Sequence, residues 1–307
     1  MSQMTNAPPS AQPPPLWLRA APVVFLLLWS AGFPVGRIGI SYAGPMTFLS
    51  IRYLFVVAIM GVMMIILRPA LPQGAEWKHL VVVGMLVQGL YFGLGYGALA
   101  LGVSAGVAAL IASLQPILTA VLAPRLAGEP VAPATWVGLT LGLAGAILVI
   151  ITKSGIGQVT RLGLVAAVGS LCAMTAGTFY EKRYGVSHHP VPAALVQNGV
   201  ALLGLLPIAI FAEHFAVTPS LPLAASLAYL IIGNSVIAIG LLLAMVRRGQ
   251  VSRVSTLFFL VPPLAAFLSW LLLGEQVPPL AWVGFGLAAV GVGITTGVFR
   301  GRRPGMA

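Results

Sequence analysis

The sequence predicts an all-α integral membrane protein with ten transmembrane helices, arranged as two inverted five-helix repeats. Its composition, its long apolar segments and a motif that occurs twice lead to this prediction. Apolar residues make up 59% of the 307 residues, charged residues make up only 7%, and the mean hydropathy is +1.02. Soluble domains contain about 25% charged residues. Because so few charges cannot cover a surface that faces water, most of the outer surface is expected to face lipid.

Ten apolar segments are each long enough to cross a bilayer, which takes about 20 residues in a helix. Lipid offers no hydrogen bonds to an exposed backbone, so helices are expected, whereas a β-barrel would need an alternating polarity that these segments lack. In chain order the segments run over residues 21–41, 46–67, 79–100, 104–123, 132–152, 162–182, 191–212, 223–245, 253–273 and 278–299.

Basic residues predict the orientation of these segments. If the N-terminus is cytoplasmic, twelve Lys and Arg residues lie on the inner side, whereas only Arg37, Lys153 and Arg161 lie on the outer side. Cytoplasmic loops of membrane proteins are enriched in Lys and Arg. Both termini are therefore expected in the cytoplasm, residues 1–20 as a disordered proline-rich tail and residues 300–307 as a basic tail. The same rule accounts for the net charge of +11 without a nucleic-acid partner.

The segment GEPVAPATWVG, which begins at Gly128, is nearly repeated by GEQVPPLAWVG, which begins at Gly274, an offset of 146 residues. Five predicted spans separate the copies, and since five is odd, the copies have opposite orientations in the membrane. An early Glu, an early Pro and an interfacial Trp suit any helix start, but this alternative does not explain why other residues align at the same offset. Two inverted repeats, residues 21–152 and 162–299, are therefore predicted, as in alternating-access transporters.

The stretches FLSIRYL, SLQPILTAVLA and TLFFLVPPLAAFLSWLLLGEQVPPLAWVGFGLAAVGVGI resemble the EamA-domain family of the drug/metabolite transporter superfamily. The resemblance extends over residues 20–300, and it implies a multi-pass exporter of amino acids or related metabolites in the bacterial inner membrane. Within the family, the chain is similar to the YddG-type group of aromatic amino acid exporters. Many members have Glu before the proline of the fourth span. This chain has Gln115 there, so a carboxylate role at that position is not expected.

Polar residues inside the predicted spans are the candidates for substrate binding. Gln88, Tyr91 and Tyr96 recur at helical spacing on one face of the third span, and the offset of 146 residues makes Asn234 the equivalent of Gln88. Two amides near the middle of the membrane suit a neutral or zwitterionic ligand. Alternatively, each amide hydrogen-bonds a neighbouring helix and the aromatic side chains only pack.

Two other spans are candidates for the opposite wall of the site, although their residues equally suit contacts between helices. They are the first span, with Trp29, Ser30 and Phe33, and the sixth span, with Met174 and Thr178. Gln115 of the fourth span is a further candidate for substrate binding. Prolines inside spans are expected to kink a helix and to act as hinges. They are Pro34, Pro116, Pro262 and Pro263.

Arg37 and Arg52 are both expected in the outer third of the membrane, because a helix rises about 1.5 Å per residue. Each of them either binds a substrate carboxylate or extends to the outer interface. The second alternative is favoured at this point, because long basic side chains commonly reach the headgroup region in this way.

No motif indicates ATP, a cofactor or a metal, since the Walker A and HExxH motifs are absent and the chain contains no Asp. Every His and Glu lies at a span end or in a loop, so uncoupled facilitated export or exchange is predicted. Proton-coupled efflux of lipophilic drugs is the alternative. A channel would need a polar ring, and an intramembrane enzyme would need a catalytic pair, neither of which the spans contain. The expected partners are a small-molecule substrate and the lipid bilayer.

Overall fold

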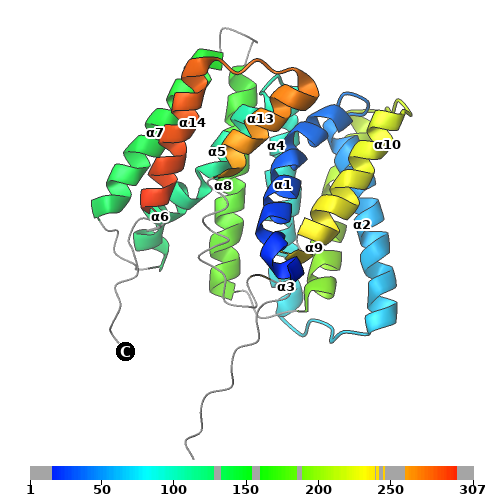
Figure 1. The fold of residues 1–307 in the computed structure, drawn as a ribbon. Coiled ribbons are helices and arrows are strands. Elements are labelled where there is room, and N and C mark those ends of the chain that lie inside the picture. Colours follow the sequence, from blue (N-terminus) through cyan, green and yellow to red (C-terminus); the bar gives the residue numbers. More distant parts are fainter. Residues whose placement is uncertain are drawn as a thin grey trace, which may run out of the picture.

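The computed structural model describes residues 16–127, 133–153, 160–184, 189–238 and 260–295, together with residues 240, 241 and 245 (Figure 1). In this part of the chain the regular elements are all helices, and one isolated antiparallel bridge joins Ala43 to Val217. The predicted all-α class is therefore confirmed. The predicted C-terminal tail and most of the N-terminal tail lie outside the described residues.

Six helices of the described residues are long and apolar enough to cross a membrane. They are α1 (Leu16–Gly39), α2 (Pro45–Leu67), the run of α3 (Glu76–Val83), η1 (Gly84–Tyr91) and α4 (Phe92–Ala100), α8 (Arg161–Tyr184), α9 (Pro190–Phe211), and the run of α10 (Leu221–Ala228) and η2 (Tyr229–Ala238). Shorter apolar stretches lie in α5 (Ala105–Ser113) with α6 (Gln115–Ala127), in α7 (Pro133–Lys153), in α13 (Val261–Leu273) and in α14 (Pro279–Thr295). Several membrane spans are thus supported, and a total of ten stays a prediction.

Three features of the helices differ from the prediction. Helix α1 begins at Leu16, inside the predicted tail, because its apolar sequence already starts there. The fourth span is not one helix, since α5 ends at Ser113 and α6 begins at Gln115. Pro116 follows directly, and it has no N–H to bond the carbonyl four residues earlier. Pro262 lies in the first turn of α13, where a missing N–H costs little, and not in the middle of a helix.

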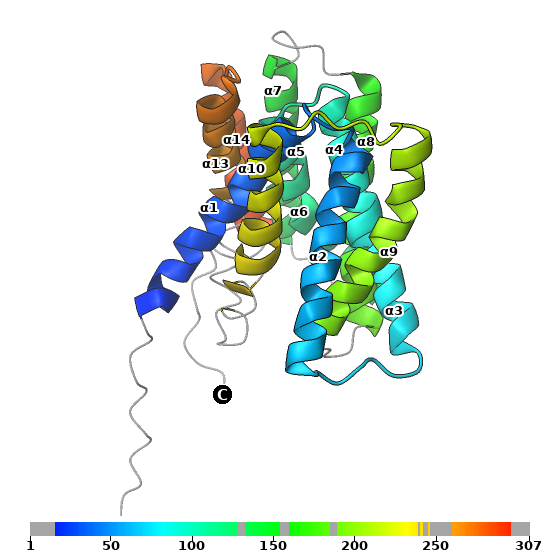
Figure 2. The ribbon, with the colours of Figure 1, turned by 90° about the vertical axis from the view of Figure 1, so that its right-hand side faces the viewer.

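Neighbouring helices come from opposite halves of the chain. Helix α7 packs along α14, and α2 packs along α9 (Figure 1). Helix α1 contacts α13 and η2, whereas α8 contacts α6, η1 and α4 (Figure 2). Exchanging the two halves turns the contacts of α1 with α13 and η2 into those of α8 with α6 and η1, and it maps the pairs α7–α14 and α2–α9 onto themselves. A two-fold relation between the halves requires this arrangement.

Glycines allow α7 and α14 to approach closely. A Cβ atom on Gly145 would lie 2.5 Å from the Gly284 carbonyl oxygen and 2.6 Å from the Ala288 nitrogen. A Cβ atom on Gly291 would lie 2.4 Å from the Gly142 nitrogen. These neighbours are backbone atoms, which cannot move aside as a flexible side chain can. Small residues at such contacts are typical of membrane helices, which associate largely through close packing.

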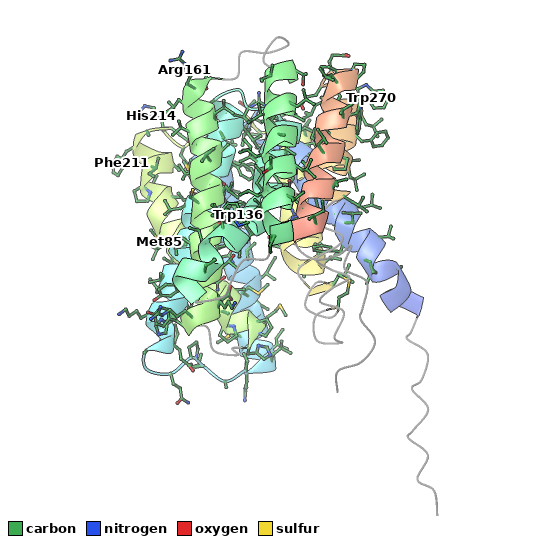
Figure 3. The ribbon with its side chains drawn as sticks, turned by 90° about the vertical axis from the view of Figure 1, so that its left-hand side faces the viewer. Met85, Trp136, Arg161, Phe211, His214 and Trp270 are labelled. Atoms are coloured by element: carbon green, nitrogen blue, oxygen red, sulfur yellow. The ribbon has the colours of Figure 1, made fainter. Side chains whose placement is uncertain are left out.

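Large apolar side chains cover the outer surface of the bundle. Phe211 is 81% exposed and Trp136 is 55% exposed, and both lie on the outside of the ribbon together with Trp270 (Figure 3). Buried apolar residues form clusters inside, one of them where α4, α5 and α8 meet α7, α13 and α14. An exposed apolar surface of this extent is expected in lipid and is unusual for a soluble monomer.

Two π-helical segments, η1 and η2, lie at equivalent positions in the two halves. The offset of 146 residues moves η1 (84–91) onto residues 230–237, which lie within η2. Each segment contains an amide that the sequence indicated, Gln88 in η1 and Asn234 in η2. π-Helical segments are rare, and they are frequent at functional sites. The sequence pattern did not predict them, because a π-helix differs from an α-helix only in its hydrogen-bond register.

Candidate functional site

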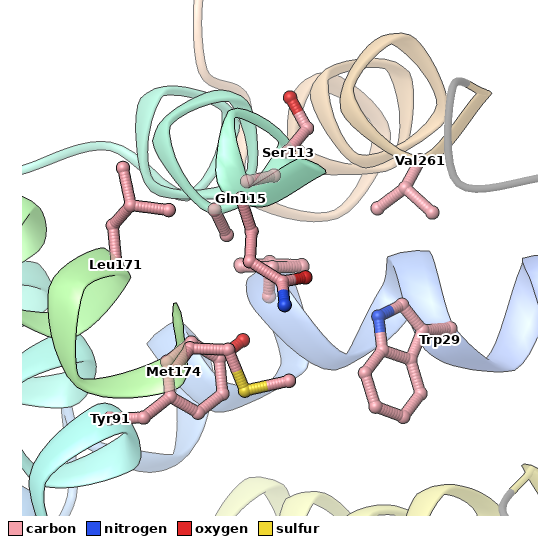
Figure 4. A pocket seen from close by; sticks show the side chains of 10 residues that line it. Trp29, Tyr91, Ser113, Gln115, Leu171, Met174 and Val261 are labelled. Carbon is pink, nitrogen blue, oxygen red and sulfur yellow. The ribbon is translucent and has the colours of Figure 1, made fainter. Parts of the chain in front are cut away.

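A cavity of about 50 Å³ lies among α1, η1, α5, α6, α8 and α13, and therefore between the two halves of the chain (Figure 4). Its lining is mainly apolar and aromatic, with a few polar side chains, which is the usual composition of a small-molecule site. Pockets that hold drug-sized ligands have volumes of about 300–1,000 Å³. The cavity must therefore widen before it admits a molecule as large as an amino acid.

Five of the predicted site residues line this cavity. They are Trp29 and Phe33 from α1, Tyr91 from η1, Gln115 from α6 and Met174 from α8. The Gln115 amide points into the space between Trp29 and Met174 (Figure 4). The aromatic rings provide flat apolar surface, and the amide provides both a donor and an acceptor. Such a lining can bind a ligand that has an apolar or aromatic body and a polar group.

Five further lining residues were not predicted, namely Ala109, Ala112, Ser113, Leu171 and Val261. Leu171 precedes Met174 by about one helical turn, so the two share a face of α8. Val261 is the equivalent of Gln115 at the offset of 146 residues, so the repeat contained a signal for it. Ser113 reaches the cavity because α5 ends there, and its hydroxyl donates to the Leu110 carbonyl at 2.7 Å.

Hydrogen bonds from α8 orient Gln115. Its Nε2 donates to the Thr178 hydroxyl oxygen at 3.0 Å, and the Thr178 hydroxyl donates to the Met174 carbonyl at 2.9 Å. Thr178 is not among the residues that line the cavity. It therefore supports the Gln115 amide, and its contact with a substrate stays a prediction.

The amides of the two π-helical segments also lie outside the cavity lining. The backbone carbonyl of Gln88 accepts a hydrogen bond from the Tyr53 hydroxyl at 2.6 Å. Asn234 lies against α1, where a Cβ atom on Gly32 would be 2.4 Å from its Nδ2. The Oδ1 of Asn234 is buried and has no hydrogen-bond partner among the described residues. Contact of either amide with a substrate stays a prediction.

Ser30 and Tyr96 are buried between helices. The Ser30 hydroxyl has no hydrogen-bond partner in the described part of the chain. The Tyr96 ring stacks on Phe48, with ring centroids 5.8 Å apart, and its hydroxyl lies 2.6 Å from where a Cβ on Gly36 would be. Tyr96 therefore packs α4 against α1 and α2. Pro34 is buried within α1, as predicted, and its role as a hinge stays a prediction.

The two arginines have different surroundings. Arg37 donates through Nη1 to the carbonyl of Leu99, and this hydrogen bond ties α1 to the end of α4. Arg52 on α2 is only 5% exposed, and its Nη2 donates to the Ser235 hydroxyl oxygen at 3.0 Å. The Arg52 side chain is enclosed by protein and does not extend to an interface, so the favoured interpretation was wrong for this residue.

Two carboxylates bind helix N-termini that are distant in sequence. Glu213, after α9, accepts hydrogen bonds from the backbone N–H groups of Met46 (3.0 Å) and Thr47 (2.7 Å) and from the Thr47 hydroxyl (2.8 Å). Glu275, after α13, accepts from the Ala105 N–H at 3.1 Å. A carboxylate there satisfies free N–H groups and interacts favourably with the helix dipole. The sequence placed both at span ends without a role, because it does not show such long-range partners.

The His and Glu side chains that the structure describes lie away from the cavity. No His or Glu is among the lining residues. Among the described residues, no group of three or more His, Cys, Asp or Glu side chains is close enough to hold a metal ion. The described His and Glu residues lie at helix ends or in loops, namely Glu76, Glu181, Glu213, Glu275, His79, His189 and His214. Glu129 and His188 lie outside the described residues.

Comparison with known proteins shows the class to which this fold and cavity belong. The EamA-like transporter family matches residues 19–151 and, a second time, residues 161–297. The chain therefore belongs to the EamA-like transporter family. It is a membrane transporter of the drug/metabolite transporter type, with several membrane-spanning helices.

Individual relatives are consistent with this class. The "Uncharacterized transporter YvbV" of Bacillus subtilis is 28% identical over 265 residues, which is 82% of each chain. The "Probable amino-acid metabolite efflux pump" of Salmonella typhimurium is 25% identical over 294 residues, 92% of this chain and 95% of the relative. A solved structure, described as "Crystal structure of protein", has a TM-score of 0.64 at 18% identity and covers 94% of this chain and 99% of its own, which shows a shared fold.

Proposed function

We propose that this protein exports neutral or aromatic amino acids, or closely related metabolites, across the bacterial inner membrane by alternating access. The observation that supports this most directly is the cavity between the halves, where Trp29, Phe33 and Tyr91 surround the Gln115 amide. An aromatic side chain can pack on these rings while a polar group bonds the amide. The Salmonella relative is named for amino-acid metabolite efflux, which is consistent with such a substrate.

An inverted-repeat architecture supports the alternating-access part of the proposal. The family matches the chain twice, and the contacts between helices are preserved when the halves are exchanged. Such transporters bind their substrate near the midplane between the repeats, at interrupted helices. Here the cavity adjoins the break between α5 and α6 and the segment η1. We therefore place the substrate site between a first repeat at residues 21–152 and a second at 162–299.

The orientation with both termini in the cytoplasm makes the described state closed toward the outside. In that orientation, the Arg37 bond to Leu99, the Glu213 bonds to the start of α2 and the Glu275 bond to the start of α5 all lie on the outer side. A fourth bond there joins the Thr160 hydroxyl to the Leu101 carbonyl at 2.8 Å. Export then requires that these bonds break before the substrate leaves.

The chemistry of the cavity supports uncoupled movement. Proton-coupled transporters generally use a membrane-embedded carboxylate or His that changes its charge during the cycle. The lining contains neither, and Gln115 has an amide that does not titrate. We expect the substrate gradient alone to drive export or exchange.

Counterflow in liposomes tests the proposal. The purified protein is reconstituted in liposomes loaded with one unlabelled amino acid, and uptake of the labelled amino acid is measured for a panel, with and without a proton gradient. We expect uptake of neutral or aromatic amino acids that requires only the trapped substrate. Absence of uptake across the panel would contradict the amino-acid proposal and would favour lipophilic drugs. Uptake that occurs only with a proton gradient would contradict the uncoupled mechanism and would leave the proposed substrate class unchanged.

A matched pair of variants links the uptake to the cavity. Trp29→Ala removes a ring that lines it, whereas Trp136→Ala removes a ring that is 55% exposed on the outer surface. We expect Trp29→Ala to lower uptake by about tenfold, since burying an aromatic side chain contributes about 1.5–3 kcal/mol. Trp136→Ala should leave uptake near the wild-type rate. Equal effects of the two variants would show that the cavity is not the binding site.

A further inference from the structure

Arg52 is a buried charge whose hydrogen-bonding capacity is mostly unused. Its side chain is 5% exposed, and its Nε and Nη1 atoms are buried and have no hydrogen-bond partner among the described residues. Nη2 donates to the Ser235 hydroxyl oxygen at 3.0 Å, and the Tyr96 hydroxyl is a further hydrogen-bond partner of the guanidinium. Ser235 in turn donates its own hydrogen to the Leu230 carbonyl at 3.0 Å. A guanidinium has five N–H donors. The three on Nε and Nη1 have no acceptor among the described residues.

Nothing anionic in the described part of the chain compensates this charge. The two carboxylates near the outer ends of helices, Glu213 and Glu275, are bound to the starts of α2 and α5. Aromatic rings provide partial compensation, since the guanidinium carbon lies 4.9 Å from the centre of the Phe92 ring and 5.9 Å from that of Tyr53. An unpaired charge in such surroundings is strongly unfavourable for stability, so a structural role explains it poorly.

Arg37 is an arginine with a structural role in this protein, and it differs from Arg52. It is only partly buried, and its guanidinium bonds the Leu99 carbonyl at the end of α4. In the described part of the chain, no carbonyl or other acceptor bonds the Nε and Nη1 atoms of Arg52. The planar fork that these atoms form matches the two oxygens of a carboxylate, which it can bind through two parallel hydrogen bonds.

The Tyr91–Phe92 pair connects Arg52 to the cavity. Tyr91 lines the cavity, Phe92 lies over the guanidinium, and their ring centroids are 4.7 Å apart in an edge-to-face arrangement. The junction between η1 and α4 falls between these two residues. Because the cavity is too small for an amino acid in this state, it must rearrange, and a shift at this junction moves the two rings together.

We propose that Arg52 binds the carboxylate of the transported substrate, so that the protein selects free amino acids and related carboxylic acids over analogues that lack a carboxylate. This inference rests on the proposed function, since it assigns the substrate group that the cavity itself does not bind. The apolar part of the substrate then occupies the space between Trp29 and Tyr91, and its carboxylate accepts hydrogen bonds from Nε and Nη1 of Arg52.

Paired substrates test this assignment. Counterflow is measured for phenylalanine and for phenylalaninamide, which differ in the carboxylate, with the wild type, Arg52→Gln, Arg52→Lys and the control Arg161→Gln, which removes an exposed charge at the start of α8. The wild type and the control should transport the acid about tenfold faster than the amide. The reason is that hydrogen bonds between a guanidinium and a carboxylate are about twice as strong as hydrogen bonds between neutral groups. Arg52→Gln should abolish this preference, and Arg52→Lys should restore part of it.

A structural role for Arg52 would give a different result. If Arg52 only stabilised the fold, Arg52→Gln would lower the melting temperature and would slow both substrates in proportion. We expect instead that the melting temperature of Arg52→Gln is equal to or above that of the wild type, because an uncompensated buried charge has been removed. A wild type that transports acid and amide equally well would also overturn the assignment.

Binding separates this inference from the proposed function. The melting temperature of the purified wild type is compared in phenylalanine, in indole-3-acetate and in their amides. If no amino acid is transported but the carboxylates still raise the melting temperature of the wild type and not of Arg52→Gln, the anion site stands and the proposed function fails. If amino acids are transported while carboxylate and amide stabilise the protein equally, the proposed function stands and the Arg52 site is wrong.

Discussion

The hydrogen bonds of Glu213 lead to a prediction about the outer side of the transporter. Its carboxylate accepts three hydrogen bonds from Met46 and Thr47 at the start of α2. In Glu213→Gln only one oxygen remains to accept, the NH₂ group faces backbone N–H donors, and the negative charge at the helix N-terminus is lost. All these interactions join the loop after α9 to α2, so they stabilise the closed state and not a state in which the two have separated.

The size of the effect can be worked out from these contacts. Loss of a side-chain cap costs about 0.5–2 kcal/mol, and loss of a charge at a helix N-terminus costs about 0.3–1 kcal/mol. Together they shift the equilibrium by about 1–3 kcal/mol toward the state that is open to the outside. Since 1.4 kcal/mol corresponds to a factor of ten, the ratio of open to closed protein should rise roughly 5- to 150-fold.

A cysteine on α2 reports this opening. Ser50 is 1% exposed, and its hydroxyl has no hydrogen-bond partner in the described chain, so Ser50→Cys changes little in the closed state. The exposed Cys172 is first replaced by Ser. Labelling with a membrane-impermeant maleimide from the outside should be at least fivefold faster in Glu213→Gln. The control Glu76→Gln alters a carboxylate that caps Gln73 near the start of α3, and it should not change the rate.

Two results would refute this reasoning. An unchanged labelling rate in Glu213→Gln would show that its carboxylate does not hold the outer side closed. Faster labelling only from the cytoplasmic side would show that the orientation is the reverse of the one proposed, because the Glu213 loop would then face the cytoplasm.

Three further predictions concern packing, the cavity and coupling. Gly145→Ala should destabilise the protein by about 1–3 kcal/mol in denaturant unfolding, because its methyl group meets the α14 backbone. Gly286→Ala, which has open space around it, should not; equal effects would contradict the packing. Thr178→Val should raise the KM of counterflow by roughly 3- to 10-fold, because the Gln115 amide loses its partner. Thr140→Val on the exposed side of α7 is the control, and an unchanged KM in both variants would show that Thr178 does not influence substrate binding. Finally, wild-type counterflow should not respond to a proton gradient, whereas Gln115→Glu should respond once a carboxylate lies in the cavity; a wild-type response would contradict uncoupled transport.

The sequence was sufficient for the class of protein, because that class depends on local composition. Long apolar segments with few charges have no stable alternative to membrane helices, whatever their neighbours are. Trp29, Phe33 and Met174 were predicted at the substrate site and they line the cavity, whereas their contact with a substrate stays a prediction. Each lies on a face of its helix that the spacing of residues defines, and the repeat suggested that these faces meet between the halves.

Other features were decided only by tertiary structure. Gln88 and Asn234 were predicted at the site, yet they lie outside the cavity, because residue spacing defines a face of a helix and not the rotation of that helix against its neighbours. The π-helical register of η1 and η2 adds to that rotation, and hydropathy does not report it.

The surroundings of the two arginines were also not predictable from the sequence. Arg37 lies in the last turn of α1 and Arg52 lies early in α2, and the sequence gives them equivalent alternatives. Arg37 bonds a carbonyl 62 residues away, and Arg52 is enclosed by residues of α4 and η2, with Ser235 183 residues away. The charges were visible in the sequence, but their partners come from segments that meet only when both halves have packed together. Composition and periodicity act over a few helical turns, and they determined the membrane fold; the environment of each buried charge depends on contacts across the whole chain, and only the tertiary structure determined it.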